Sequence, residues 1–233
     1  MSESVDSKIV VAGTDTEIGK TTVTCALLAA LRKAGLVVRG IKPVESGTES
    51  QPSREEEDGR RLAAAAEQAA PQEALQRLRA PLAPPVAARD EAVILRPKVW
   101  LEAIRDIAAG ADLSFVEGAG GLLSPLADGF DTRDMAVALK APVLLVAADS
   151  LGTLNHSFLT IEALQTAGCE LAGVVFSAPE IPDASTGRNA DVIARHFPEL
   201  PAATLPRVAD NAEGAELFSE SPFLRRLLDG VGV

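Results

Sequence analysis

The chain has no tyrosine, and aromatic residues make up only 3% of its 233 residues. Its 47% hydrophobic content therefore comes mainly from alanine, valine, leucine and isoleucine. Such a composition suits parallel strands that are buried on both faces and covered by alanine-rich helices. The length fits one large α/β domain, and no break in composition indicates a second one, so we expect a single domain over residues 1–233.

Cysteine and histidine are also scarce. Cys25 and Cys169 are too few for a disulfide scaffold, and we expect both to be free thiols in a reducing compartment. The only histidines are His156 and His196, which leaves too few residues for a His/Cys metal cluster.

Positive charge and long apolar runs are lacking as well. The net charge of −11 argues against a nucleic-acid partner and against an anionic membrane surface. The segment Met1–Ser7 is polar and resembles neither a signal peptide nor a transit peptide. No apolar run approaches the roughly 20 residues that a membrane-spanning helix needs. We therefore expect a cytoplasmic protein that binds neither nucleic acid nor membrane.

Strand-like and helix-like segments alternate along the chain. The apolar runs that predict strands are Lys8–Ala12, Val37–Ile41, Leu113–Glu117, Val143–Ala147, Leu171–Phe176 and Ala203–Leu205. Helices are predicted at Thr21–Ala34, Lys98–Ala109, Asn155–Ala167, Arg188–Phe197 and Phe223–Leu228. This alternation predicts a doubly wound, mostly parallel sheet with helices on both faces. Residues 46–58 and 71–96 break the pattern, and loops of that length are often functional or mobile.

A phosphate-binding loop follows the first predicted strand. Residues 13–22 read Gly-Thr-Asp-Thr-Glu-Ile-Gly-Lys-Thr-Thr, between a strand and a helix. Backbone amides around Gly19 can surround an anion, Lys20 can reach the β- and γ-phosphates, and the Thr21 hydroxyl can bind Mg²⁺. Five residues rather than four separate Gly13 from Gly19, so this is a variant of the usual spacing. The motif predicts a fold of the P-loop NTPase type.

Three further motifs lie at the ends of predicted strands, where open parallel sheets bind their ligands. Lys42 and Ser46 follow the second strand. A lysine at the end of a strand is often only a solvated surface residue. Beside Lys20, however, Lys42 suits a reaction that accumulates negative charge. Glu117 ends the third strand like a Walker B carboxylate, and the glycines after it allow a close backbone approach to a ligand. After the fourth strand Asn155 is predicted to cap a helix, whose free amides can hold a substrate carboxylate.

Together these motifs resemble those of the dethiobiotin synthetases, the ATP-dependent ligases of biotin biosynthesis. The resemblance rests on residues 13–21, 42–47, 117–121 and 151–156, and extends from about Lys8 to Leu205. It implies 7,8-diaminononanoate, CO2 and ATP as substrates, Mg²⁺ as cofactor, and a homodimer with substrate sites near the subunit interface. The family forms a carbamate on one amine, phosphorylates it to a carbamic-phosphoric anhydride, and closes the ring with the second amine.

The resemblance also implies roles for single residues. Lys20 and Lys42 are the catalytic residues, which act on the transferring phosphoryl group and the carbamate oxygens. Mg²⁺ is bound by Thr21, Asp58 and Glu117. The substrate is contacted by Thr16, Ser46, Gly152 and Asn155. The nucleotide is bound by Glu17, Ile18, Gly19, Lys20, Thr21, Thr22, Asp58, Glu117, Gly118, Ala119, Gly120, Ser177, Ala178 and Glu213.

Two of these assignments leave alternatives open. The loop before Asp58 is about one residue shorter than the family pattern, and residues 55–57 are three neighbouring glutamates. Many family members also carry Asn-Asp where this chain has Ser177-Ala178, followed by Pro179. Without the amide a bidentate match to adenine is lost, so we expect a looser choice of nucleotide.

A different class of protein is the alternative. A deviant P-loop ATPase that acts as a dimerisation switch has an extra lysine early in its P-loop, where this chain has Asp15. An amidotransferase of cobalamin biosynthesis shares the fold but needs a glutaminase domain, for which this chain is too short. The resemblance therefore favours the ligase.

Overall fold

All six predicted strands lie in one parallel sheet. The computed structural model describes residues 7–233. The strands are β1 (Ser7–Gly13), β2 (Val38–Ile41), β5 (Leu113–Gly121), β8 (Val143–Ala148), β9 (Leu171–Ser177) and β10 (Ala202–Leu205). Their order in the sheet is β10-β9-β8-β1-β5-β2. The chain thus builds β2 and β5 on one side of β1 and then crosses to the other side, which confirms the doubly wound fold predicted from the sequence.

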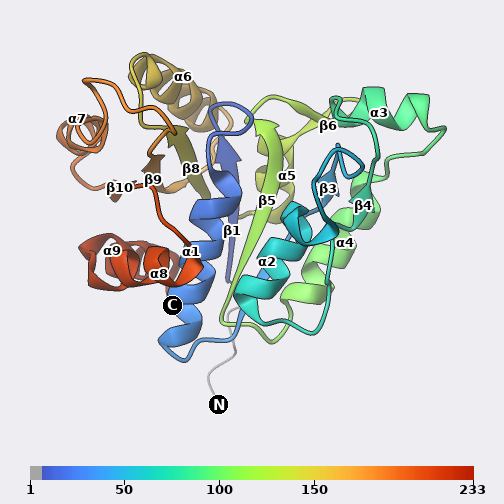
Figure 1. The fold of residues 1–233 in the computed structure, drawn as a ribbon, viewed down its shortest axis with the longest axis horizontal. Helices are drawn as coiled ribbons and strands as arrows, with labels where there is room; N and C mark the ends of the chain where they lie inside the picture. The colour runs from blue at the N-terminus through green and yellow to red at the C-terminus, as the bar shows by residue number, and fades with distance from the viewer. Residues whose placement is uncertain (1–6) are drawn as a thin grey trace.

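Helices cover both faces of this sheet because successive strand residues point to opposite sides. Ile9 and Val11 face the core beneath α1 (Lys20–Lys33), α2 (Asp58–Ala66), α8 (Asn211–Glu220) and α9 (Pro222–Val231). Val10 and Ala12 face the opposite core, which includes side chains of α4 (Pro97–Ala108), α5 (Thr132–Leu139) and α6 (Thr153–Thr166). In Figure 1 α1 crosses the sheet with α2 and α8 on its two sides. The helix α7 (Asn189–His196) packs with α6 near β9.

The predicted helices differ from the observed ones in three respects. The helix after β8 begins at Thr153 and is capped by Gly152, so the prediction that Asn155 is the N-cap is wrong. Gly152 has a φ of +93°, a left-handed conformation that glycine adopts without a steric penalty. Helices α5 and α8 were not predicted from the sequence. Each begins after an aspartate cap, Asp131 and Asp210 respectively, a signal that the sequence does contain.

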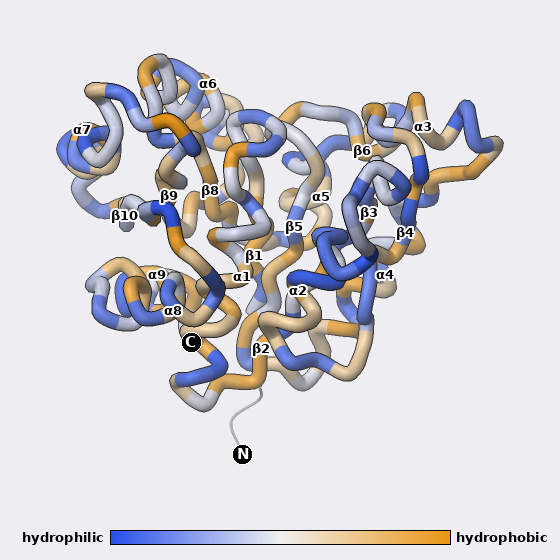
Figure 2. Tube along the Cα trace, viewed as in Figure 1, coloured by the Kyte–Doolittle hydropathy of each residue, from blue (hydrophilic) through white to orange (hydrophobic). Residues whose placement is uncertain are grey.

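The two segments predicted as long loops contain short elements beside the main sheet. These are a 3₁₀ turn (Arg54–Glu56), β4 (Gln76–Arg77) and α3 (Pro84–Asp90), and β3 (Val44–Glu45) directly precedes the first segment. Strands β3 and β4 pair in parallel as a two-stranded ribbon, and β6 (Pro125–Ala127) pairs with β7 (Phe130–Asp131) in a second small sheet. Figure 2 shows that the chain from β3 to the start of α2 is mainly hydrophilic, whereas β8 is hydrophobic. Within residues 7–233 no helix is long and apolar enough to span a membrane.

Candidate active site

A polar cavity of about 390 Å³ opens at the carboxyl ends of β1, β2 and β5. Its walls include the P-loop from Thr16 to Thr22, together with Lys42, Ser46 and Gly120. The predicted residues Asp58 and Ala119 also line it. Three of the four motifs of the sequence therefore meet in one place, together with Asp58, as the parallel topology requires.

The P-loop is folded around the side chain of its own lysine. The Lys20 Nζ donates a hydrogen bond of 2.8 Å to the carbonyl oxygen of Asp15. Glu17 and Gly19 have φ values of +54° and +91°, which turn the backbone sharply before α1 begins. Burial, reinforced by the neighbouring charge of Lys42, lowers the pKa of Lys20 to about 8. The loop thus holds its ammonium group in a poorly hydrated position beside free amides of a helix N-terminus.

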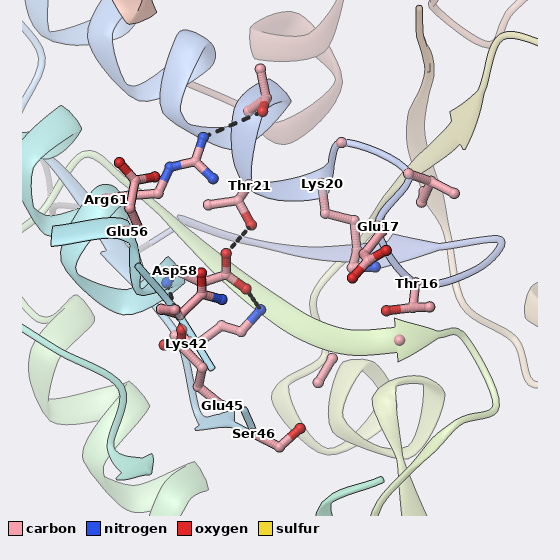
Figure 3. A pocket seen from close by; sticks show the side chains of 16 residues that line it. Thr16, Glu17, Lys20, Thr21, Lys42, Glu45, Ser46, Glu56, Asp58 and Arg61 are labelled. Carbon is pink, nitrogen blue, oxygen red and sulfur yellow. Dashed lines mark hydrogen bonds and ion pairs between the residues drawn. The ribbon is translucent and has the colours of Figure 1, made fainter. Parts of the chain in front are cut away.

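Lys42, Asp58, Glu117 and Thr21 form a hydrogen-bonded cluster at the base of the cavity. Figure 3 shows Thr21, Asp58 and Lys42 of this cluster. The Lys42 Nζ lies 2.8 Å from Asp58 Oδ2 and 2.9 Å from Glu117 Oε1, and it donates a third bond of 3.2 Å to the carbonyl oxygen of Gly118. The Thr21 Oγ1 lies 2.8 Å from Asp58 Oδ1 and 2.7 Å from Glu117 Oε1. One ammonium and one hydroxyl thus connect two carboxylates that come from α2 and β5.

The charges of this cluster stabilise one another. Burial acts to lower the pKa of Lys42, but the two carboxylates outweigh it and raise that pKa. Burial acts in the opposite direction on Asp58, and the Lys42 ammonium holds the pKa of that carboxyl below its ordinary value. Lys42 and Glu117 are 3% and 0% exposed, so both charges depend on their partners rather than on water.

The donor set of the cluster suits a hard cation. A hydroxyl has a single hydrogen, so Thr21 can donate to Asp58 or to Glu117 but not to both at once. The Glu117 Oε2 is buried without a hydrogen-bond partner. Within residues 7–233 no group of three or more His, Cys, Asp or Glu side chains is arranged to hold a metal ion. Two carboxylates and a hydroxyl fit Mg²⁺, which takes few protein ligands and completes its shell with phosphate oxygens and water.

The structure distinguishes Asp58 from the three glutamates that precede it. Glu57 is fully buried, and its carboxylate accepts hydrogen bonds of 2.8 and 2.6 Å from the Arg77 guanidinium. Glu55 is exposed, and Glu56 lies on the cavity wall without a bond to the cluster. Asp58 alone among the four contacts Thr21 and Lys42. The geometry therefore favours Asp58 as the acid of this loop.

A second cavity of about 420 Å³ adjoins the other side of the P-loop. Ser177 and Ala178, at the end of β9, line it together with Gly19, Thr22 and Arg207. Ser177 packs closely on the P-loop: a Cβ added at Gly19 would lie only 2.2 Å from the Ser177 Oγ. The predicted residue Glu213 is exposed outside both cavities, and its carboxylate accepts a hydrogen bond from the amide of Ala209.

Two of the predicted substrate residues lie outside both cavities. Gly152 and Asn155 are exposed at the start of α6, beside Leu151, which is 85% exposed. The remaining substrate residues, Thr16 and Ser46, do line the first cavity. One lining residue that the sequence analysis missed is Arg61, whose guanidinium lies 3.4 Å from the Thr22 Oγ1. Its spacing of three residues after Asp58 places both on one face of a helix, a signal that was present.

Comparison with known proteins gives a consistent result. Residues 7–213 match the family model of an AAA domain. Among curated proteins, the "ATP-dependent dethiobiotin synthetase BioD" of an Anaeromyxobacter species is 43% identical over 94% of this chain and 96% of its own length. The proteins of that name from Ralstonia nicotianae and Rhodococcus jostii are 41% and 43% identical, each over 85% of this chain and over 88% and 82% of their own lengths.

Solved structures with little sequence similarity share the fold. A ParA family ATPase from Chlorobium tepidum matches with a TM-score of 0.55 at 11% identity, over 97% of this chain and 98% of its own. The cell division ATPase MinD of Pyrococcus furiosus matches with a TM-score of 0.53 at 18% identity, over 98% of both chains. At such identities the likeness concerns the P-loop NTPase fold alone.

Proposed function

The chain belongs to the family of ATP-dependent dethiobiotin synthetases, and from this we propose how its residues carry out the reaction. One amine of 7,8-diaminononanoate attacks CO2 to give a carbamate, and a carbamate oxygen then attacks the γ-phosphorus of ATP. ADP leaves, and the second amine attacks the carbonyl carbon of the resulting anhydride and expels phosphate. The observation that carries this proposal is the cluster of Lys42, Asp58, Glu117 and Thr21 beside a P-loop.

Lys20 and Lys42 neutralise the charge that develops during phosphoryl transfer. A carbamate and a triphosphate are both anions, so bringing them together requires positive groups that are already oriented. Lys20 lies within the P-loop, where it would contact the β- and γ-phosphates. Lys42 lies between the carboxylates and the Gly118 carbonyl, on the cavity wall that also contains Ser46. We assign the transferring phosphoryl group to both lysines and the carbamate oxygens to Lys42.

Thr21, Asp58 and Glu117 would hold Mg²⁺. Their oxygens converge within 2.8 Å of the Thr21 Oγ1, and the free Glu117 Oε2 provides a further lone pair. The ion would neutralise charge on the β- and γ-phosphates of the nucleotide. In this arrangement the carboxylates serve two cations, since both also contact Lys42.

The nucleoside would occupy the second cavity, and the diamine the first. Ser177 and Ala178 then border the base, while the P-loop from Glu17 to Thr22 binds the phosphates. Four residues of this loop line both cavities: Glu17, Ile18, Gly19 and Thr22. Ala119 and Gly120 approach the reacting groups from the end of β5. Thr16 and Ser46 offer hydroxyl groups to the diamine from opposite walls of the first cavity.

A homodimer would complete the substrate site. Gly152 and Asn155 line neither cavity of their own chain but are exposed at a helix N-terminus, next to the exposed apolar side chain of Leu151. Free amides at such a terminus suit the carboxylate of the diaminononanoate chain. We therefore assign these residues to the site of the other subunit.

The decisive experiment measures ADP release that depends on 7,8-diaminononanoate, together with dethiobiotin detected by mass spectrometry. We expect both to require CO2, ATP and Mg²⁺ or Mn²⁺, and a chelator to abolish both. ATP hydrolysis that is indifferent to the diamine would contradict the proposal and favour an ATPase switch. Asp58→Asn should weaken the dependence on Mg²⁺; unchanged dependence would move the ligand to a neighbouring glutamate.

A further inference from the structure

The carboxylate of Glu45 lies against the first residues of α2. Its Oε1 accepts a hydrogen bond of 2.6 Å from the amide of Asp58, and its Oε2 accepts one of 3.0 Å from the amide of Gly59. These are amides of the first helical turn, which have no carbonyl partner within the helix. Glu45 is only 3% exposed, and burial raises its pKa while the Gly59 amide opposes that shift. A buried carboxylate therefore caps α2 from another element, since the residue preceding the helix makes no side-chain cap of its own.

The strand that presents Glu45 is itself fixed. Glu45 pairs with Arg77 in the register of the β3–β4 ribbon. Its carbonyl oxygen accepts a hydrogen bond of 2.8 Å from the amide of Leu78. Arg77 in turn binds the carboxylate of Glu57, the residue directly before Asp58. Glu45 and Arg77, which are paired in the ribbon, thus bind three consecutive residues, 57–59, at the start of α2.

The start of α2 also has no room to shift toward the segment before β4. A Cβ added at Gly59 would lie 2.3 Å from the backbone nitrogen of Ala74 and 2.7 Å from the carbonyl carbon of Glu73. The helix start is therefore confined between Glu45 on one side and this backbone on the other. Since Asp58 is the first residue of α2, confinement of its backbone also fixes the direction from which its carboxylate meets Thr21 and Lys42.

We propose that Glu45 is a positioning residue for the metal site: by capping α2 it holds Asp58 where its carboxylate can share a cation with Thr21 and Glu117. This inference rests on the proposed assignment of Asp58 as a Mg²⁺ ligand. Glu45 acts through Asp58 and needs no contact with the nucleotide or the ion. Its loss should therefore weaken metal binding and leave metal-free nucleotide binding intact.

The test compares Glu45→Gln with Glu91→Gln in the full-length protein. Glutamine keeps the size of the side chain but turns an NH2 group toward one of the two amides, so one hydrogen bond is replaced by a donor–donor contact. Glu91 is a matched control, because its Oε1 also accepts hydrogen bonds from two backbone amides, those of Arg79 and Ala80, away from the cavity. Mn²⁺ binding in the presence of ADP is measured by electron paramagnetic resonance, and ADP binding without metal by calorimetry.

We expect Glu45→Gln to weaken Mn²⁺ binding about tenfold or more, with metal-free ADP binding within twofold of the parent protein. Glu91→Gln should leave both unchanged. The kcat of Glu45→Gln should recover at saturating Mg²⁺, which a general loss of structure would not allow. Glu45→Asp keeps the charge but has a side chain one methylene shorter, and it should weaken Mn²⁺ binding to an intermediate degree. This variant replaces Glu45→Gln in the test if the glutamine variant does not fold.

Asp58→Asn in the same assay separates the role of Glu45 from the assignment of Asp58 as a metal ligand. If Asp58→Asn weakens Mn²⁺ binding and Glu45→Gln and Glu45→Asp do not, the role of Glu45 is overturned and the metal site stands. If Asp58→Asn binds Mn²⁺ like the parent protein, the metal assignment itself is wrong. Equal loss of metal binding and of metal-free ADP binding in Glu45→Gln would also overturn the proposal, because it would show a collapse of the whole site.

Discussion

Lys42 is a buried ammonium with three oxygen partners, and its removal leaves two carboxylates facing each other. We predict that Lys42→Ala lowers kcat/KM by about 100-fold or more, equivalent to ~3 kcal/mol of transition-state stabilisation. Lys20→Ala should lower kcat/KM similarly and also weaken ADP binding, since the P-loop lysine contacts ground-state phosphates. Steady-state kinetics and calorimetry measure the two effects. A Lys42→Ala enzyme with near-normal kcat/KM would show that the site is wrongly assigned.

Cys25 gives a prediction about pH. Burial in α1 raises the pKa of its thiol to about 12, from an ordinary value of 9.0. Above pH 9.0 the unfolded thiol ionises while the folded one stays protonated, so the folded state retains a proton that the unfolded state has lost. The Cys25 thiol therefore leaves the free energy of unfolding independent of pH below pH 9.0. At higher pH it lowers the free energy of unfolding by about 1.4 kcal/mol per pH unit. Denaturant unfolding between pH 9 and 11 should show a shallower decline for Cys25→Ala. Parallel curves for the two proteins would contradict the prediction.

Some site residues could be predicted from the sequence and others could not. Lys42, Glu117 and Thr21 were predictable because each lies at a fixed place after a strand, and parallel strands bring those places together. The cap by Glu45 was not predictable, although the residue belongs to a recognised motif. Its partners are amides 13 and 14 residues further along the chain, and no local pattern links them. The ion pair of Glu57 and Arg77 joins residues 20 positions apart, and in the sequence Glu57 resembled a solvated acid.

At the level of elements, the end of β9 makes a prediction about nucleotide choice. Ser177 offers at most one hydroxyl to a base and Ala178 none, whereas the contacts of Lys20 and Thr21 are independent of the base. A binding site discriminates between bases through polar groups that stay without a hydrogen-bond partner when the wrong base binds. We predict that CTP or GTP supports turnover with a kcat/KM within about 10- to 100-fold of that for ATP. Rates measured with all four nucleoside triphosphates test this, and a preference for ATP beyond about a thousandfold would contradict it.

Elements were predictable where their signal was strong and local. The six strands are mainly apolar runs, and each was predicted to within four residues of its observed ends. The helix α5 was missed because Phe130 and Asp131 before it form part of a small hairpin, so that strand and helix patterns overlap. Asn155 was wrongly chosen as a cap because its side chain is a common cap, whereas the actual cap depends on the positive φ of Gly152.

For the whole molecule, the proposed dimer predicts a mass in solution about twice the 24.2 kDa of the chain. Light scattering measures this mass. A stronger test mixes two inactive variants, Lys42→Ala and Asn155→Asp, after unfolding and refolding. If each site uses Lys42 of one subunit and Asn155 of the other, mixed dimers contain one intact site, and about a quarter of the parent activity should return. No recovery would show that both residues serve the same chain.

The organisation of the whole chain was predicted from composition and order. The alternation of strand-like and helix-like segments predicted the doubly wound sheet. The scarcity of aromatic residues predicted cores made of aliphatic side chains, and only a few phenylalanines and one tryptophan are buried in them. That residues 1–233 form a single domain stays a prediction. A single calorimetric unfolding transition, with equal calorimetric and van 't Hoff enthalpies, is the expected result.

The confinement of α2 has a consequence for the length of the segment that precedes it. Residues 51–53 are exposed, and the chain on both sides returns to the β3–β4 ribbon, through Glu45 at one end and through Glu57 and Arg77 at the other. Since doubling the length of a flexible loop costs only about 0.6 kcal/mol, residues can be gained or lost here with Asp58 still in place. Relatives that differ in loop length at this point can therefore share one catalytic geometry.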